Sequence, residues 1–208
     1  MKMTLNSEKY GVQQLKEQCF LNDLRTIVFS PGSRNAPLVI SFTRDERFTC
    51  YVIPDERSAA FYAMGMAEQL QKPVAVACTS GSALLNYYPA VSEAFYRNIP
   101  LVIISADRPL EWTDMGDGQT IRQEGVFKNH IIDQTSLLES PKSENEKWFN
   151  QREIDRLLQK CKKGPVHINF PFNEPLYNLS EDKVSGPVHT ELLELESVLS
   201  SHQVSKIS

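Results

Sequence analysis

The stretch Thr26-Ile-Val-Phe-Ser-Pro-Gly-Ser-Arg-Asn-Ala-Pro-Leu38 sets the fold of this chain. It begins as an apolar run, which is typical of a strand, and continues as a polar loop that opens a helix. The same arrangement recurs after Phe48-Thr-Cys-Tyr-Val-Ile53, where Pro54-Asp-Glu-Arg-Ser58 comes next. Loops that leave the carboxyl ends of parallel strands build the ligand sites of open α/β sheets. We therefore expect both loops to line one crevice at the edge of a sheet.

Further apolar runs begin at Val74, Leu101 and Val166. The first four of the five runs recur at intervals of roughly 25 residues with helical periodicity between them, which is the rhythm of βαβ units. The apolar periodicity predicts helices over residues 7–22, 56–71, 82–97 and 146–160. Residues 1–177 are thus predicted to form a doubly wound α/β domain, with a mainly parallel sheet and helices on both faces.

Two segments stand apart from this pattern. Residues 107–125 form a connection longer than most compact domains contain, so we expect it to serve a function. Residues 178–208 are polar, with a short helical pattern at 190–199. We interpret this tail as a linker towards a next domain that this chain lacks.

Composition excludes several classes of protein. Hydrophobic residues make up 41% of the 208, and the net charge of −4 comes without a dense basic stripe, which argues against a nucleic-acid partner. No apolar stretch reaches the ~20 residues of a membrane span, and the N-terminus lacks the apolar core of a signal peptide. The four cysteines are scattered without a CxxC pair, which favours a reducing, cytoplasmic location over a disulfide framework.

Glu56 is the first candidate for catalysis. It lies at a predicted helix start. The structural alternative is that Asp55 caps the helix and Glu56 only complements the helix dipole. The helix that follows, Ser58-Ala-Ala-Phe-Tyr-Ala-Met-Gly-Met-Ala67, is rich in small residues that permit close backbone approach. We therefore expect a buried or interfacial helix start, where desolvation would raise the pKa of the carboxyl and suit it to proton transfer.

Arg34 and Arg108 each follow a predicted strand, and a guanidinium matches a carboxylate or phosphate in two parallel hydrogen bonds. With Ser33 and Gln119 they are candidates for one anion-binding pocket. Pairing with surface acids remains the alternative for each arginine. Two further arginines, Arg57 and Arg122, compete for the same role.

Other motifs carry less weight. Thr79-Ser-Gly-Ser82 follows the third strand and precedes a helix, so its amides are suited to receive an anion. Neither a Walker loop nor a GxGxxG sequence is present, and Ser80 lies in no G-x-S-x-G elbow. Gly116-Asp-Gly118 follows no apolar strand, and the histidines lack HExxH spacing, so we predict no metal site in this chain. His167 alternates within a strand pattern and is interpreted as structural.

Six pieces in this order resemble one family closely. They are Ser30-Pro-Gly-Ser-Arg34, Asp55-Glu-Arg57, Thr79-Ser-Gly81, Ala106-Asp-Arg-Pro109, Gln119-Thr-Ile-Arg-Gln123 and Asn169-Phe-Pro-Phe-Asn-Glu-Pro-Leu176. The chain resembles the thiamine-diphosphate-dependent SEPHCHC synthases of menaquinone biosynthesis, the MenD family. The resemblance covers the N-terminal pyrimidine-binding domain, from about residue 7 to residue 177.

The resemblance implies an activity and a set of roles. The family decarboxylates 2-oxoglutarate on thiamine diphosphate and adds the product to isochorismate. Glu56 would hydrogen-bond the pyrimidine ring of the cofactor and favour the imino form that generates the ylid. The other implied ligands are Pro31 and Thr79 for the cofactor, and Ser33, Arg34, Arg108 and Gln119 for the substrates.

The resemblance also implies partners for the domain. The family holds Mg²⁺ and the diphosphate on a later domain, and its site forms between subunits. We therefore expect at least a dimer of the longer protein, and an inactive fragment on its own. Two alternatives remain open: another thiamine-dependent lyase or acetohydroxyacid-synthase-type enzyme, and a non-catalytic anion-binding or dimerisation domain.

Overall fold

The structure is a computed structural model that describes residues 5–181 and residue 184. The helical pattern at residues 190–199 lies outside the described residues. Six strands form one sheet in the order β3-β2-β4-β5-β7-β6, and all neighbouring strands are parallel. Their bounds are β2 (Thr26–Phe29), β3 (Thr49–Val52), β4 (Val74–Cys78), β5 (Leu101–Asp107), β6 (Asp133–Ser136) and β7 (Val166–Pro171). The predicted α/β fold with a parallel sheet is confirmed.

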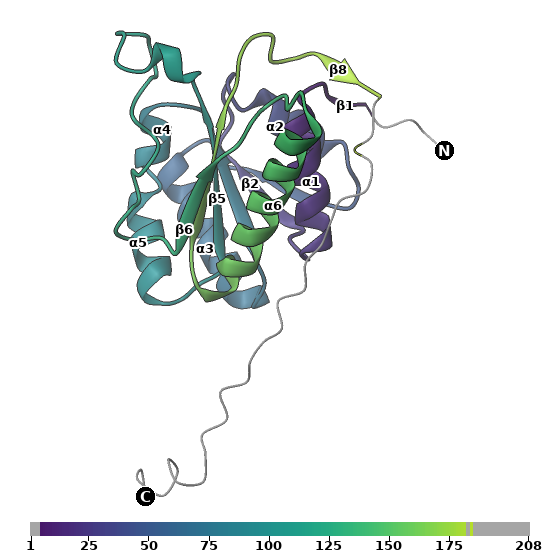
Figure 1. The fold of residues 1–208 in the computed structure, drawn as a ribbon. Coiled ribbons are helices and arrows are strands. Elements are labelled where there is room, and N and C mark those ends of the chain that lie inside the picture. The colour runs from purple at the N-terminus through teal and green to yellow at the C-terminus, as the bar shows by residue number, and fades with distance from the viewer. Residues whose placement is uncertain (1–4, 182–183, 185–208) are drawn as a thin grey trace, which may run out of the picture.

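Helices cover both faces of the sheet (Figure 1). One face carries α1 (Tyr10–Leu21), α2 (Ala36–Thr43) and α6 (Glu144–Lys160). The opposite face carries α3 (Glu56–Leu70), α4 (Ser82–Leu85) and α5 (Tyr88–Tyr96). Two short 3₁₀ turns, η1 (Leu110–Trp112) and η2 (Cys161–Lys163), lie in the connections. The doubly wound arrangement follows from the alternation of strand and helix along the chain.

The strands divide the core into two layers because successive side chains point to opposite faces. Ile27 and Phe29 of β2 pack in the layer under α1, α2 and α6, whereas Val28 packs in the layer under α3 and α5. All five residues of β4 and all seven of β5 are buried. Strands buried on both faces explain why these segments are continuous apolar runs.

The expected single helix over residues 82–97 is two helices, because Pro89 interrupts it. Proline has no N–H to donate to the carbonyl four residues earlier, here that of Leu85. The chain instead makes a tight turn, in which Tyr87 N donates to the Leu84 carbonyl at 3.1 Å. Two helices therefore follow β4, and the second begins with proline in its first turn.

A second, two-stranded sheet joins the two ends of the described chain. β1 (Asn6–Ser7) pairs antiparallel with β8 (Leu179–Ser180), and Glu8 N donates to the Asn178 carbonyl at 3.0 Å. Neither strand was predicted. β8 lies beyond residue 177, where the sequence placed the end of the domain.

The strand order reverses between β2 and β4. The chain leaves β2 towards α2 on one face, and it leaves β4 towards α4 and α5 on the other. Loops that depart in opposite directions from neighbouring parallel strands leave a crevice between them, and open α/β sheets bind ligands there. The loops at residues 30–34 and 79–81 flank this point.

Candidate functional site

The loop after β2 is held in a compact turn by Asn35. The Asn35 side-chain amide donates to the Ser30 carbonyl at 2.9 Å, and its oxygen accepts from Gly32 N at 3.0 Å. Pro31 and Ser33 are exposed at the top of this turn. A Cβ at Gly32 would lie 2.5 Å from Cβ of Thr79, so only glycine allows the two loops to meet this closely.

Glu56 begins α3 at the same edge of the sheet. Asp55 caps the helix by accepting from Ser58 N at 2.7 Å, as expected, which leaves the half-buried Glu56 carboxylate outside the cap. Burial raises the pKa values of Cys78 and Tyr87, and the nearby Glu56 carboxylate raises both further. The negative charge of Glu56 therefore affects the pKa of groups at the end of β4 and just before α5.

Arg34 is buried and already has two partners. Its Nη1 donates to the Phe172 carbonyl at 2.9 Å, and its Nη2 lies 3.2 Å from a carboxylate oxygen of Glu174. Burial lowers the pKa of Arg34 most, and the neighbouring positive charge of Arg108 lowers it further. The two guanidinium groups are thus close enough for the charge of Arg108 to lower the pKa of Arg34. The anion-pocket hypothesis requires such proximity.

Arg108 is more open than Arg34. Its Nη2 donates to the Gly118 carbonyl at 3.3 Å, and its Nε lies 3.3 Å from a carboxylate oxygen of Asp117. The competing arginines differ, since Arg57 is exposed and Arg122 pairs with Asp114 at the surface. Of the four, Arg34 and Arg108 form the pair in which the charge of one lowers the pKa of the other.

The loop after β4 contacts the segment that carries Gln119. Gly81 has a φ of +82°, and a Cβ there would lie 2.9 Å from Cα of Gln119. Gln119 itself is exposed, with a left-handed φ of +55°. Thr79 is buried beneath Gly32, so the loops after β2, β4 and β5 meet in order.

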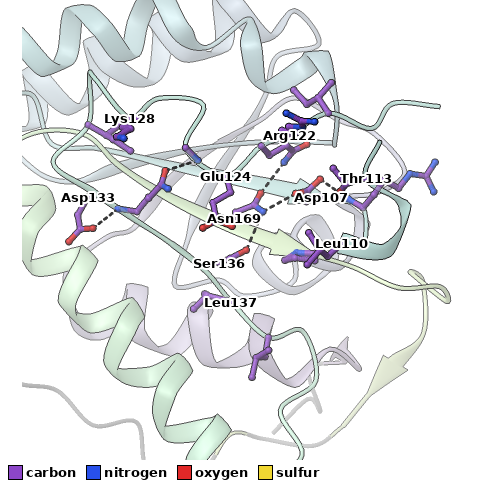
Figure 2. A pocket seen from close by; sticks show the side chains of 18 of the residues that line it. Asp107, Leu110, Thr113, Arg122, Glu124, Lys128, Asp133, Ser136, Leu137 and Asn169 are labelled. Atoms are coloured by element: carbon purple, nitrogen blue, oxygen red, sulfur yellow. Dashed lines mark hydrogen bonds between the residues drawn. The ribbon is translucent and has the colours of Figure 1, made fainter. Parts of the chain in front are cut away.

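A buried polar network that sequence reasoning missed lies behind these loops. Figure 2 shows Asn169 between Asp107 and Ser136, with its amide nitrogen donating to both, at 2.9 Å and 3.2 Å. Ser105 and Gln123 both donate to the Asn169 side-chain oxygen, at 2.7 Å and 2.9 Å. The motifs contained Gln123 and Asn169, but nothing in their spacing indicated that they meet.

The network lines a cavity of about 1030 Å³ between residues 107–125 and the edge strand β6. Of the predicted site residues, only Arg108 reaches this cavity. Pro31, Ser33, Arg34, Glu56, Thr79 and Gln119 do not line it. The predicted site therefore lies mostly outside this cavity and meets it at Arg108.

Two absences concern the part of the chain that the structure describes. Within residues 5–181 and 184, no group of three or more histidine, cysteine or acidic side chains is placed to hold a metal ion. No helix in those ranges is both long enough and apolar enough to cross a membrane.

Residues 11–137 match the family described as thiamine pyrophosphate enzyme, N-terminal TPP binding domain. The chain is similar to the 2-succinyl-5-enolpyruvyl-6-hydroxy-3-cyclohexene-1-carboxylate synthase of Flavobacterium psychrophilum, at 56% identity over 185 residues, which are 89% of this chain and 32% of the relative. The synthase of Flavobacterium johnsoniae is 54% identical over 182 residues, 88% of this chain and 32% of the relative. That of Porphyromonas gingivalis is 48% identical over 177 residues, covering 84% and 31%.

The chain spans about a third of the length of these curated relatives. The family match agrees with the α/β fold and its six-stranded parallel sheet. The resemblance noted from the motifs is confirmed. The chain belongs to the family of N-terminal TPP binding domains of thiamine pyrophosphate enzymes, in the form found in SEPHCHC synthases.

Proposed function

We propose that this domain belongs to a longer protein that decarboxylates 2-oxoglutarate on thiamine diphosphate and adds the product to isochorismate. The observation that carries the proposal is the placement of Arg34 after β2 and Arg108 after β5, at the carboxyl edge of the sheet where Glu56 begins α3. The charge of Arg108 also lowers the pKa of Arg34. Both substrates carry carboxylates, and paired guanidinium groups suit such anions. Identities of 54–56% to synthases of this reaction support the same assignment.

The residues present fit the pyrimidine half of the cofactor. Glu56 is half-buried, and its charge raises the pKa values of the buried Cys78 and Tyr87. Near such desolvated groups a hydrogen bond between the carboxylate and a ring nitrogen would be strengthened. Pro31 and Thr79, on the loops that meet at Gly32, would help to hold the cofactor. When bound, the cofactor would supply the nucleophilic carbon, and the Glu56 carboxylate oxygen would share a proton with a ring nitrogen.

The substrate-side residues divide the work of orientation. Arg34 is fixed by Phe172 and Glu174, so its guanidinium is a rigid partner for a carboxylate. Arg108 is more open and contacts Gly118, the neighbour of Gln119 in the chain. The exposed side chains of Ser33 and Gln119 would donate hydrogen bonds. Carboxylates held in this way would be presented to the cofactor without a search for orientation.

We further propose that the site is completed by chain that this domain lacks, which would hold the diphosphate and Mg²⁺ in a homo-oligomer of at least two subunits. Further along the helix that Glu56 begins, α3 presents Phe61 and Tyr62, which are 42% and 48% exposed. A Cβ at Gly65 would meet nothing within 4 Å, so this stripe has room for a second subunit to approach. The domain alone is then expected to be inactive. A cytoplasmic location agrees with its four free cysteines.

The test is isochorismate consumption by the protein extended to its natural stop codon, supplied with 2-oxoglutarate, thiamine diphosphate and Mg²⁺. The Glu56→Gln variant keeps the side-chain volume but removes the charge that holds the proton. We expect it to lose most of its turnover and to unfold at the parental temperature. Glu46→Gln is the matched control, because Glu46 is exposed in the turn before β3, at the other end of the strands.

Consumption that disappears in Glu56→Gln and persists in Glu46→Gln supports both the reaction and the role of Glu56. Parental turnover in Glu56→Gln would contradict the role but not the reaction. No consumption by the parental protein, with turnover of pyruvate in its place, would move the assignment to another thiamine-dependent enzyme.

A further inference from the structure

Gln123 joins the cofactor side of the proposed site to its substrate side. The side chain is 1% exposed and lies four residues after Gln119, in the long connection from β5 to β6. Its oxygen accepts from Gly81 N at 2.8 Å, and its nitrogen donates to the Ala106 carbonyl at 3.1 Å. The same nitrogen donates to the Asn169 side-chain oxygen at 2.9 Å. One buried amide thus bridges the loop after β4, the end of β5 and strand β7.

The orientation of this amide is fixed by its backbone partners. Gly81 N can only donate, so the Gln123 oxygen must face it, and the Ala106 carbonyl can only accept, so the nitrogen must face Ala106. Because one backbone group belongs to the loop after β4 and the other to strand β5, the amide sets the spacing between loop and strand. A side chain without this donor and acceptor pair cannot replace it.

Close packing extends the connection to the predicted site residues. Gly81 lies against the backbone of Gln119, where a Cβ would come within 2.9 Å of three Gln119 atoms. Two residues before Gly81, Thr79 lies directly against Gly32. Contacts this tight transmit displacement, because atoms in van der Waals contact cannot move towards one another. A shift of Gly81 therefore moves Gln119 on one side and the Thr79–Gly32 contact on the other.

We propose that Gln123 is a positioning residue, which sets the distance between the cofactor-side loop at residues 79–81 and the substrate-side segment that carries Gln119. The proposal rests on the proposed function for the identity of the two ligands. Gln123 itself touches neither ligand, since it is buried behind both loops. Its effect is on geometry, and a misplacement of about 1 Å is enough to cost about a hundredfold in rate.

Gln123→Met in the full-length protein removes all three hydrogen bonds at nearly constant volume. We expect kcat to fall about ten- to a hundredfold per folded active site. KM for 2-oxoglutarate should change little, because Arg34 is anchored by Phe172 and Glu174 rather than by Gln123. Gln134→Met is the matched control, since its oxygen accepts a single bond from Gly125 N at 3.2 Å, away from both loops.

Gln123→Glu gives a pH signature that a purely structural role would not. An ionised carboxylate would place an oxygen against the Ala106 and Asn169 oxygens, whereas the protonated acid would donate to one of them and still accept from Gly81 N. The ratio of variant to parental kcat should therefore rise as pH falls through the pKa of the introduced carboxyl. The ratio is expected to be flat for Gln134→Glu.

Amide hydrogen exchange provides a readout that does not depend on activity. In Gln123→Met, exchange at Gly81 N and in peptides spanning residues 113–121 should become faster, with peptides of α6 unchanged. Unchanged exchange in both loop segments would overturn the proposal, whatever the reaction proves to be. Parental kcat in Gln123→Met, in a protein that does turn over, would overturn it as well. Absence of parental turnover would instead count against the proposed function, and exchange alone would then decide the role of Gln123.

Discussion

Arg34 and Arg108 carry the same charge at the same edge of the sheet, yet they differ in what else they hold. Arg34 is 7% exposed and satisfies the Phe172 carbonyl, which follows β7. Arg108 contacts the Gly118 carbonyl and Asp117, both within its own connection. At Arg34 the structure shows the pairing with an acid, Glu174, and the positive charge of Arg108 also lowers the pKa of Arg34. The anion-binding role of Arg34 stays a prediction.

The two arginines are therefore expected to separate binding from stability. Arg108→Ala in the full-length protein should raise KM for a carboxylate substrate about ten- to a hundredfold, because a hydrogen bond to a charged group contributes about 1.5–3 kcal/mol. Arg34→Ala should do the same and also lower the free energy of unfolding by about 1–3 kcal/mol, because it leaves a buried carbonyl without a donor. Urea unfolding and steady-state kinetics measure the two effects. Equal stability of both variants would contradict this difference.

At the scale of elements, apolar periodicity located the buried strands and the long helices. It missed the elements that do not depend on an apolar pattern. β6 is Asp-Gln-Thr-Ser, an edge strand whose four residues are all half-buried, so no apolar alternation marks it. The break at Pro89 was readable from the sequence, since proline interrupts a helix wherever it falls in the interior. β1 and β8 are two residues each and exist only because the fold brings the two ends together.

The start of α6 was also readable, because Ser143 and Glu146 form a capping box at the helix start. Ser143 accepts from Glu146 N at 3.2 Å, and Glu146 accepts from Ser143 N at 3.0 Å. Ser143→Ala should lower the free energy of unfolding by about 1 kcal/mol, measured by urea titration. Glu146→Ala and the double variant complete a cycle. Strict additivity of the two losses would show that the box does not act as a unit.

For the molecule as a whole, the loops that make the candidate site followed from the sequence, and the network that supports them did not. Strand ends and loop chemistry are local features, so the order of residues along the chain is enough to place 30–34, 55–57 and 79–81 at one sheet edge. Ser105, Asn169 and Gln123 come together only because β5 and β7 pair with Ser105 opposite Asn169. The register between strands 60 or more residues apart is set by the packing of the entire domain. Apolar periodicity along the sequence therefore does not predict it.

The network also predicts how the domain responds to acid. His167 donates to the Ser105 hydroxyl at 2.7 Å, since that hydroxyl gives its own proton to Asn169, and burial lowers the pKa of His167 from 6.5 to about 3. The unfolded chain therefore binds a proton below pH 6.5 that the folded domain does not. Stability should fall by up to about 1.4 kcal/mol per pH unit between pH 6.5 and pH 3. His167→Gln should flatten this slope in urea titrations, and an unchanged slope would assign the acid sensitivity to other groups.

The pairing of β1 with β8 has a mechanical consequence. Asn6 lies opposite Ser180 and Ser7 opposite Leu179, so the chain enters and leaves the domain side by side. A force that pulls these two ends apart would break the β1–β8 residue pairs one after the other. The six-stranded sheet would bear the force only after that. The β1–β8 pair would therefore separate first under such a force, before the loops around Glu56 are displaced.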